Sequence, residues 1–148
     1  MKLRIRGDSI RLRLTRGEVG GLVATGVVAE RTRMPAGPGF RYELRTAAEA
    51  RALTATFEAG VLGVEVPRAA AEAWAVSEDV AIQGEVPAEG GTLTILVEKD
   101  FPCLTVRQGE DDSDAFARDR LAVGRCGPRP ARCGPRRRRY LTGAIRCW

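Results

Sequence analysis

Five positively charged side chains alternate with apolar residues near the start of the chain, in two runs separated by a short turn at residues 7–9. These cations are Lys2, Arg4, Arg6, Arg11 and Arg13. Side chains two residues apart lie on the same face of a strand, so an antiparallel hairpin would gather all five on one face. Arginine can bind phosphate through two parallel hydrogen bonds, and this face is therefore a candidate anion-binding site.

Four glutamates at matching positions of later extended segments could compensate this positive charge. They are Glu43, Glu65, Glu85 and Glu98. One interpretation is a solvent-exposed sheet face whose cross-strand ion pairs each contribute little to stability. The other is a groove or tunnel that binds a phosphate or nucleotide, where the glutamates could hold Mg²⁺ for phosphate hydrolysis. The second interpretation requires the cations to line a concavity together with at least two of the glutamates.

The chain contains no histidine and no asparagine. The absence of histidine excludes Ser-His-Asp and Cys-His nucleophilic catalysis, HExxH zinc sites and the iron site of two histidines and one carboxylate. Proton transfer near neutral pH would need a Glu, Asp, Lys or Cys whose pKa is shifted. We therefore favour a non-enzymatic domain without a cofactor, and Mg²⁺ belongs only to the alternative interpretation.

The formal net charge of +5 is unevenly distributed. Residues 1–116 carry 14 basic and 18 acidic side chains, whereas residues 117–148 carry ten arginines and one aspartate. The second segment is rich in Arg, Gly, Pro and Cys and lacks the periodicity of a helix or strand. We expect a domain over residues 1–116 and a disordered tail over residues 117–148, with translation out of frame as the alternative origin of the tail. Its arginines at 136–139 could bind nucleic acid weakly and without specificity.

Neither the cysteines nor the acidic clusters have the spacing of a metal site. Cys126, Cys133 and Cys147 lack the short spacing of zinc knuckles. Cys103 follows a predicted strand, where a small buried side chain is expected. The acidic residues at 98–100 and 110–114 lack the glycine turn and the distal bidentate glutamate of a Ca²⁺ loop, so we expect solvated acidic segments there.

A hairpin and a short helix must position the cations. The alternation over residues 2–6 and 10–14 predicts two antiparallel strands. Thr15 and Glu18 have the spacing of a capping box, which predicts a helix that ends at Gly26. Residues 27–33 and 40–45 then predict two more strands around a Pro/Gly loop.

The second half of the chain repeats this order. Residues 51–58 and 61–66 predict a hairpin around Ala59-Gly60, and Pro67 is expected at the first position of the next helix. In that Ala-rich helix Trp74 is expected to be a core anchor. Residues 80–86 and 92–98 predict the last two strands.

The two halves align at an offset of 52 residues, so that Ile10 matches Leu62 and Leu22 matches Trp74. The pseudo-repeats cover residues 1–46 and 51–100. We interpret them as a tandem duplication of a ββαββ unit, which predicts an α+β domain of eight mostly antiparallel strands with two short helices outside. Edge strands of two such units could pair with each other, which favours a barrel or a tightly wrapped sheet.

An eight-stranded barrel built from a duplicated unit and lined by Arg and Glu resembles the triphosphate tunnel (CYTH-like) metalloenzymes. Those enzymes open with an E-x-E-x-K strand that binds metal and phosphate. This chain has KLRIR at residues 2–6 instead, so the metal-binding acids are missing from their expected place. The resemblance therefore implies an architecture and not a catalytic site.

Two segments resemble an uncharacterised family of small bacterial proteins. They are the opening KLRIRGDSIRLRLT, and LVEKDFPCL followed by EDDSDAF. The resemblance covers residues 1–116 and implies no known activity.

The sequence as a whole predicts a small cytoplasmic bacterial domain that acts as a non-enzymatic binding or accessory module. Its opening is too charged for a signal peptide, and no apolar run approaches the roughly 18 residues that a membrane-spanning helix needs. The sequence leaves the partner open, and a small anion on the cationic face is one candidate. The alternative is a phosphate- or nucleotide-binding protein, including a metal-dependent phosphohydrolase, that uses the same hairpin.

Overall fold

The computed structural model describes residues 1–101 and 113–116. Within them the elements follow one another in the order ββαββ-ββαββ. The strands are β1 (Lys2–Ile5), β2 (Ser9–Leu14), β3 (Val27–Thr32), β4 (Phe40–Ala47), β5 (Thr54–Glu58), β6 (Val61–Pro67), β7 (Ala81–Ala88) and β8 (Gly91–Lys99), and the helices are α1 (Arg16–Thr25) and α2 (Arg68–Val76). The expected tail at 117–148, the four cysteines and the acidic residues 110–112 lie outside the described residues.

The alternation of charged and apolar residues produces the first hairpin as predicted. Arg4 lies opposite Arg11, and Leu3 lies opposite Leu12. The cations therefore share one face of the hairpin and the leucines share the other. Leu12 and Leu14 are fully buried, so the apolar face is the one that packs into the core.

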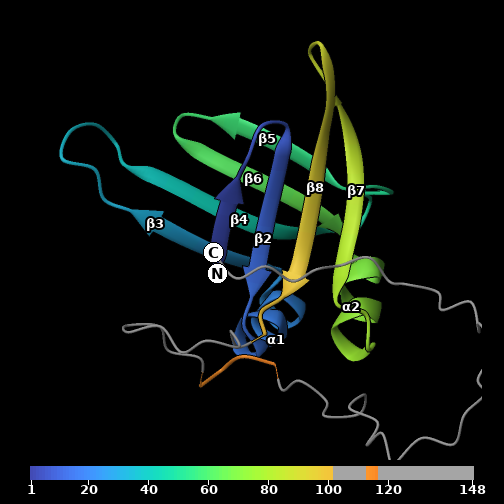
Figure 1. Ribbon diagram of the computed structural model, residues 1–148. Coiled ribbons are helices and arrows are strands. Elements are labelled where there is room, and N and C mark those ends of the chain that lie inside the picture. The colour runs from blue at the N-terminus through green and yellow to red at the C-terminus, as the bar shows by residue number, and fades with distance from the viewer. Residues whose placement is uncertain (102–112, 117–148) are drawn as a thin grey trace, which may run out of the picture.

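The strands form two separate four-stranded sheets (Figure 1). Sheet A has the order β1-β2-β8-β7, and sheet B has the order β3-β4-β6-β5. The central strands of each sheet, β2 with β8 and β4 with β6, are parallel. All other pairings are antiparallel.

The predicted barrel is wrong. Because β2 pairs with β8 and β4 pairs with β6 at the centres of the sheets, the remaining strands β1, β7, β3 and β5 are left at the edges. The two sheets then pack through their apolar faces instead of joining edge to edge. The expectation of an α+β domain with mostly antiparallel pairing is confirmed.

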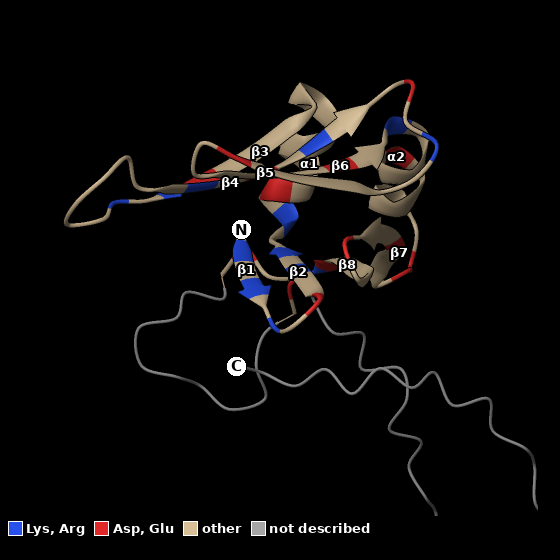
Figure 2. Ribbon diagram, turned by 90° about the horizontal axis from the view of Figure 1, so that it is seen from above, with Lys and Arg blue, Asp and Glu red and all other residues tan. Residues whose placement is uncertain are grey.

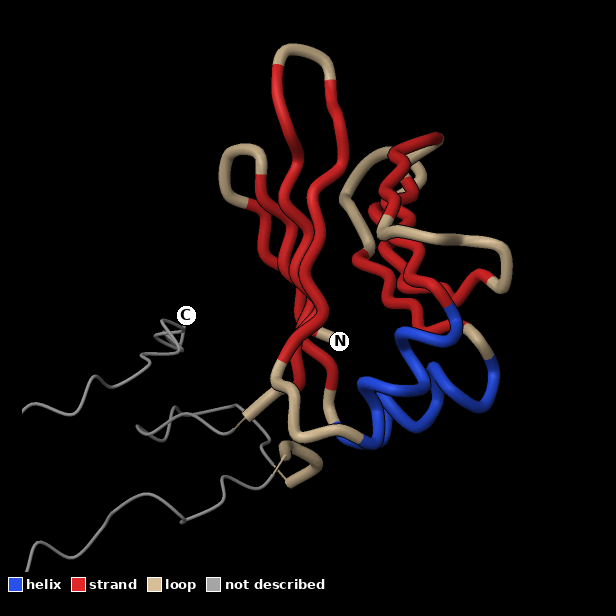
Figure 3. The backbone as a smooth tube through the Cα atoms, turned by 90° about the vertical axis from the view of Figure 1, so that its right-hand side faces the viewer, coloured by secondary structure: helices blue, strands red, loops and turns tan. Residues whose placement is uncertain are grey.

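Both helices lie next to each other at one end of the two sheets, and not around a barrel (Figure 3). The capping box of α1 forms as predicted: the Thr15 side chain accepts the N–H of Glu18, and the Glu18 carboxylate accepts the N–H of Thr15 at 2.8 Å. Gly26 ends α1 in the left-handed conformation at φ 80°, which glycine adopts without the penalty of a Cβ. Pro67 is the N-cap of α2 and not its first helical residue.

The core lies between the apolar faces of the sheets and is closed at one end by the helices. Sheet A contributes Ile10, Leu12, Leu14, Ile95 and Val97, sheet B contributes Leu44, Leu62, Val64 and Val66, and the helices contribute Val19, Leu22, Ala71 and Trp74. Trp74 is 4% exposed, so its prediction as a core residue is confirmed. Leu53, from the β4–β5 connection, fills the space above Gly84 of β7.

Each half of the chain contributes one hairpin to each sheet. Strands β1 and β2 pair with β7 and β8, and strands β3 and β4 pair with β5 and β6. The two halves are therefore interlocked, and neither sheet is complete without both. In the part of the chain that the structure describes, no helix has the length and apolar character needed to cross a membrane.

Candidate functional site

The cationic hairpin face is the outer face of sheet A, opposite the core. Lys2 lies opposite Arg13, and Arg4 lies opposite Arg11, so the register places these four cations on one surface. Figure 2 shows this positive colour along β1 and β2, with acidic residues on the neighbouring β8. Arg6 follows β1 at the turn and is exposed.

One of the four predicted glutamates, Glu98, contacts cations of this face. Its Oε2 lies 3.1 Å from Nε of Arg13 and 3.7 Å from Nε of Arg11. Lys2 contacts a different acid, Asp100, with 2.9 Å between Nζ and Oδ2. The Arg13 side chain is only 7% exposed, so its bond to Glu98 is shielded from solvent, whereas the Arg11 side chain is 29% exposed.

The other three glutamates lie farther from these cations. Glu43 is buried on the outer face of sheet B between Arg41, at 3.1 Å, and Arg45. Glu65 lies on that same sheet and accepts a hydrogen bond from Thr54 at 3.4 Å. Glu85 lies on the same outer face of sheet A as the cations, opposite Thr94, but it is exposed on the edge strand β7, two strands away from β2. The structure therefore places these glutamates on two different sheets, and among the described residues no three His, Cys, Asp or Glu side chains gather into a metal-binding group.

A second cluster, which sequence reasoning did not identify, forms around Lys99. We call Trp74, Lys99, Phe101 and Phe116 the Lys99 cluster. The Lys99 side chain is buried on the core side of β8 and donates to the carbonyl oxygen of Ser77. Its ammonium group lies 5.5 Å from the ring centroid of Trp74 and 5.5 Å from that of Phe116, which is the geometry of a cation–π interaction. Phe116 also packs on Phe101, with 5.9 Å between the ring centroids.

The same cluster holds residues 113–116 against the start of α1. The Asp114 carboxylate accepts the N–H of Gly17 at 3.0 Å, and its backbone oxygen accepts the N–H of Arg16 at 2.9 Å. The N–H of Phe116 donates to the carbonyl of Asp100 at 2.8 Å. These contacts satisfy N-terminal amides that helix α1 cannot satisfy itself. We infer that the Lys99 cluster is structural, because the Lys99 ammonium group is occupied by the Ser77 carbonyl and by two aromatic rings.

A sequence signal for this cluster existed. Lys99 follows Ile95 and Val97 at the two-residue spacing of core positions, so the alternation places a lysine on the buried face. A buried lysine needs a hydrogen-bond acceptor and a favourable electrostatic environment. The expectation of a solvated acidic segment at residues 98–100 is therefore wrong for Lys99 and Asp100, which are both buried. The indole Nε1 of Trp74 is buried and has no hydrogen-bond partner among the described residues.

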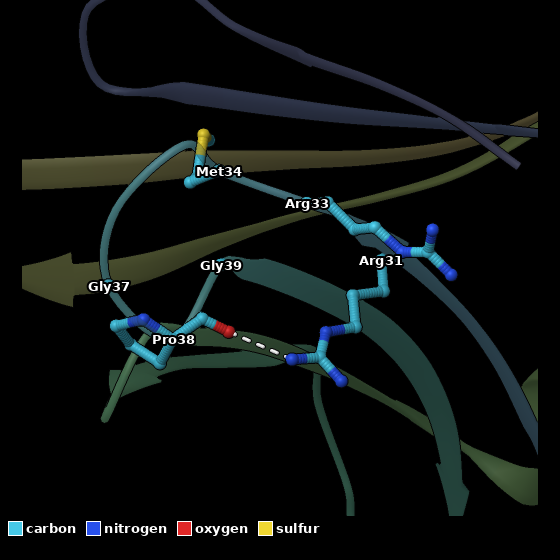
Figure 4. A pocket seen from close by; sticks show the side chains of 6 residues that line it. All are labelled: Arg31, Arg33, Met34, Gly37, Pro38 and Gly39. Carbon is cyan, nitrogen blue, oxygen red and sulfur yellow. Dashed lines mark hydrogen bonds between the residues drawn. The ribbon is translucent and has the colours of Figure 1, made fainter.

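An open pocket of about 450 Å³ lies in the β3–β4 connection. Its lining residues are Arg31, Arg33, Met34, Gly37, Pro38 and Gly39. Arg31 donates to the carbonyl of Pro38 at 3.0 Å and thereby ties the two sides of the loop together (Figure 4). Because the arginines are exposed and the pocket is open, it offers little desolvation to a ligand, and we assign Arg31 a structural role.

Tyr42 lies where the first residue of the chain meets sheet B. Its hydroxyl donates to the carbonyl of Met1 at 2.8 Å, and the terminal ammonium contacts Glu18 and Glu30. Burial raises the pKa of Tyr42, and the negative charges of Glu30 and Glu18 raise it further. The surroundings of Tyr42 therefore favour its neutral phenol, which is not the state of a catalytic base.

Comparison with known proteins gives a match to a family model. Residues 1–120 match the model of a family of unknown function, DUF7009. No curated protein and no solved structure matches the chain. The match therefore extends over both resembling segments and over the whole two-sheet fold, and it adds no activity.

Proposed function

Since the chain belongs to the family of unknown function DUF7009, we propose that this domain is a non-enzymatic binding module that recognises an anionic partner through the outer face of sheet A. The residue on which this proposal depends is Arg11. Chemistry that requires histidine is excluded by the sequence. The scatter of the four predicted glutamates over two sheets gives no support to a metal-dependent phosphohydrolase.

The observation that carries the proposal is that Arg11 and Arg13 share the single carboxylate of Glu98. Arg13 makes the shorter contact, and the 3.7 Å from Arg11 exceeds hydrogen-bond length. A guanidinium group has five N–H donors. The half-buried Arg11 side chain therefore has donors available for an anion, in a position held by a central strand of the sheet.

The partial exposure of this face sets the kind of binding that we expect: Arg4 and Arg11 are half-buried and Arg13 is buried. Arg6 adds an exposed positive charge at the open end of the hairpin. An anion on such a partly exposed sheet face keeps part of its hydration, so affinity depends on ionic strength. We expect a phosphate-rich or carboxylate-rich partner bound reversibly, and not a substrate enclosed for reaction.

The test is a thermal-shift titration of the full chain with triphosphate, sulfate and chloride at matched ionic strength. Triphosphate should raise the melting temperature in a saturable way, because a ligand that binds the folded state stabilises it by RT ln(1 + [L]/Kd). Arg11→Ala should weaken the apparent affinity by about tenfold or more, since a hydrogen bond to a charged group contributes about 1.5–3 kcal/mol.

The matched control is Arg51→Ala. Arg51 is exposed in the β4–β5 connection, away from sheet A's outer face, and its loss should leave the titration unchanged. Equal responses to all three salts would mean charge screening alone and would overturn the proposal. An equal loss of affinity in both variants would overturn the assignment to Arg11.

We also propose that the two halves arose by duplication of one ββαββ unit. The buried residues of β2 and β6 support this proposal, because they match at the offset of 52 residues. The matching residues are Ile10, Leu12 and Leu14 of β2 with Leu62, Val64 and Val66 of β6, and all six are buried. The helices begin at matching residues, Arg16 and Arg68. In this origin the binding face would exist in the first half only, because Arg11 and Arg13 correspond to Gly63 and Glu65.

A further inference from the structure

The two open sheets have four edge strands, which are β1 and β7 in sheet A and β3 and β5 in sheet B. An edge strand presents backbone N–H and C=O groups that can pair with another chain. Proteins commonly prevent such pairing with short strands, prolines, or charged side chains that point inward. The four edges can be compared on these features.

Three of the edges carry a protective feature. Strand β1 has four residues and includes Lys2 and Arg4. Strand β7 contains Pro87, which has no N–H to donate. Strand β3 carries Glu30 opposite Tyr42, on the core-facing side, where it contacts the terminal ammonium.

Strand β5, with five residues, has neither a proline nor a charged side chain that points inward. Its sequence is TATFE, without proline, lysine or arginine, and its one charge is Glu58 at the end of the strand. Phe57 is 64% exposed although the register places it opposite Leu62, on the side of the sheet that forms the core. Its ring packs on Phe40 with 6.3 Å between the centroids, so the apolar face of sheet B continues to its edge.

We propose that β5 pairs antiparallel with β5 of a second copy of this chain, across a two-fold axis at Thr56. This register places Thr56 opposite Thr56, Ala55 opposite Phe57, and Thr54 opposite Glu58. Cross-strand threonine pairs and aromatic residues opposite small or branched residues are favourable. The strand is thus self-complementary, because Phe57 of each copy covers the small Ala55 of the other and no like charges are opposed.

This arrangement joins the two B sheets into one continuous sheet. It uses neither Arg11 nor any other residue of sheet A, so it is independent of the proposed anion binding. A two-fold interface uses the same surface on both copies, which is why self-complementarity of β5 points to a second copy of this chain.

The first experiment measures the mass of the full chain by light scattering over a range of concentrations. We expect a concentration-dependent dimer. Thr56→Lys should abolish it, because two lysines would face each other at the axis. Ala29→Lys, an exposed position on the other edge of the same sheet, is the matched control and should leave it unchanged. A monomer at all concentrations, or a dimer that only Ala29→Lys abolishes, would overturn the proposal.

The second experiment tests the register by disulfide formation in a chain whose four native cysteines are replaced by serine. Thr56→Cys should form an intermolecular disulfide, because opposed residues of antiparallel strands lie at about 4.5 or 5.5 Å, within the range that a disulfide spans. Glu58→Cys should not, because its copies would be separated by about four residues of strand, roughly 13 Å. Equal crosslinking of both variants would contradict the register, and circular dichroism of each variant confirms that it is folded.

Discussion

Trp74 is the largest of the buried core side chains, and it fills the space beneath an alanine-rich helix. We expect Trp74→Ala to lower the free energy of unfolding by about 3–5 kcal/mol, because the helix cannot collapse onto the cavity left between two sheets. Trp74→Phe should cost less, since it keeps an aromatic ring beneath Lys99 and removes an indole N–H that has no partner among the described residues. Denaturation in urea measures both changes.

Fluorescence gives an independent check on Trp74. In a Trp148→Phe background, all tryptophan emission comes from Trp74. We expect the blue-shifted maximum of a buried indole in the folded protein and a red shift on unfolding. A maximum typical of a water-exposed indole in the folded protein would contradict the placement of Trp74 in the core.

Tyr42 makes stability depend on pH in the alkaline range. Burial, together with the charges of Glu30 and Glu18, raises the folded-state pKa of Tyr42 above 10.0. Above the unfolded pKa the unfolded chain loses the phenolic proton first, so the folded state binds more protons and stability falls as pH rises. The contribution of Tyr42 to the free energy of unfolding is complete below pH 10.0 and is lost as the pH rises through the folded-state pKa.

Tyr42→Phe should remove that part of the alkaline loss of stability. The measurement is the unfolding free energy of both proteins at several pH values from neutral upward, in a Tyr140→Phe background. The absorbance of the phenolate then reports Tyr42 alone, and we expect it to titrate at a higher pH in the folded protein than in urea. Identical titrations in the two states would contradict the raised pKa.

At the scale of single residues, alternation predicted which side chains share a face but not what they contact. The pattern over residues 2–14 gave the correct faces of the first hairpin, because register fixes every side chain of a strand pair at once. It could not show that Glu98 and not Glu43 reaches the cations. That choice depends on β2 pairing with β8, a contact between residues 85 positions apart.

At the scale of elements, α1 is capped twice at its N-terminus. Thr15 and Glu18 form the capping box, and Asp114 accepts further N–H groups from a distant part of the chain. We expect Thr15→Ala and Asp114→Ala each to lower the free energy of unfolding by about 1 kcal/mol, as the loss of a cap does in other helices. Chemical denaturation measures both.

The control for these caps is Asp114→Asn, which keeps an oxygen acceptor and should cost less than Asp114→Ala. Asp8→Ala provides a second control, because Asp8 is exposed at the hairpin turn and caps no helix. An Asp114→Ala variant as stable as the native chain would show that residues 113–116 do not support α1.

Local signals were sufficient for most elements. The capping box, Gly26 and the Ala59-Gly60 turn act within a few residues, and each is found where expected. Ala59 and Gly60 both have positive φ, at 49° and 79°, as a tight hairpin of this kind requires. The predicted position of Pro67 was wrong by one residue: it is the N-cap of α2 and not the first helical residue, because its fixed φ suits both positions.

At the scale of the whole molecule, the sequence indicated two similar halves but not how they combine. Strand order depends on contacts between distant segments, and the patterns within β2, β4, β6 and β8 are compatible with several orders. Each sheet contains one hairpin from each half of the chain. The two hairpins meet at the centre of the sheet, where their strands pair in parallel. Barrel closure would require an edge strand of one sheet to pair with an edge strand of the other, and β1, β7, β3 and β5 pair only within their own sheets.

The interlocking of the halves leads to the last prediction. Neither residues 1–49 nor residues 50–148 should fold alone, because β2 would lack β8 and β4 would lack β6. When mixed in equal amounts, the two fragments should reassemble, since the cut at residue 49 lies in the irregular β4–β5 connection. Circular dichroism should show a cooperative transition for the mixture only, with a midpoint that rises with concentration, as expected for association. Leu44→Asp in the first fragment, which places a charge at a fully buried position of β4, should prevent reassembly. A first fragment that unfolds cooperatively as a monomer would show that a single half folds alone, and would contradict this description of the fold.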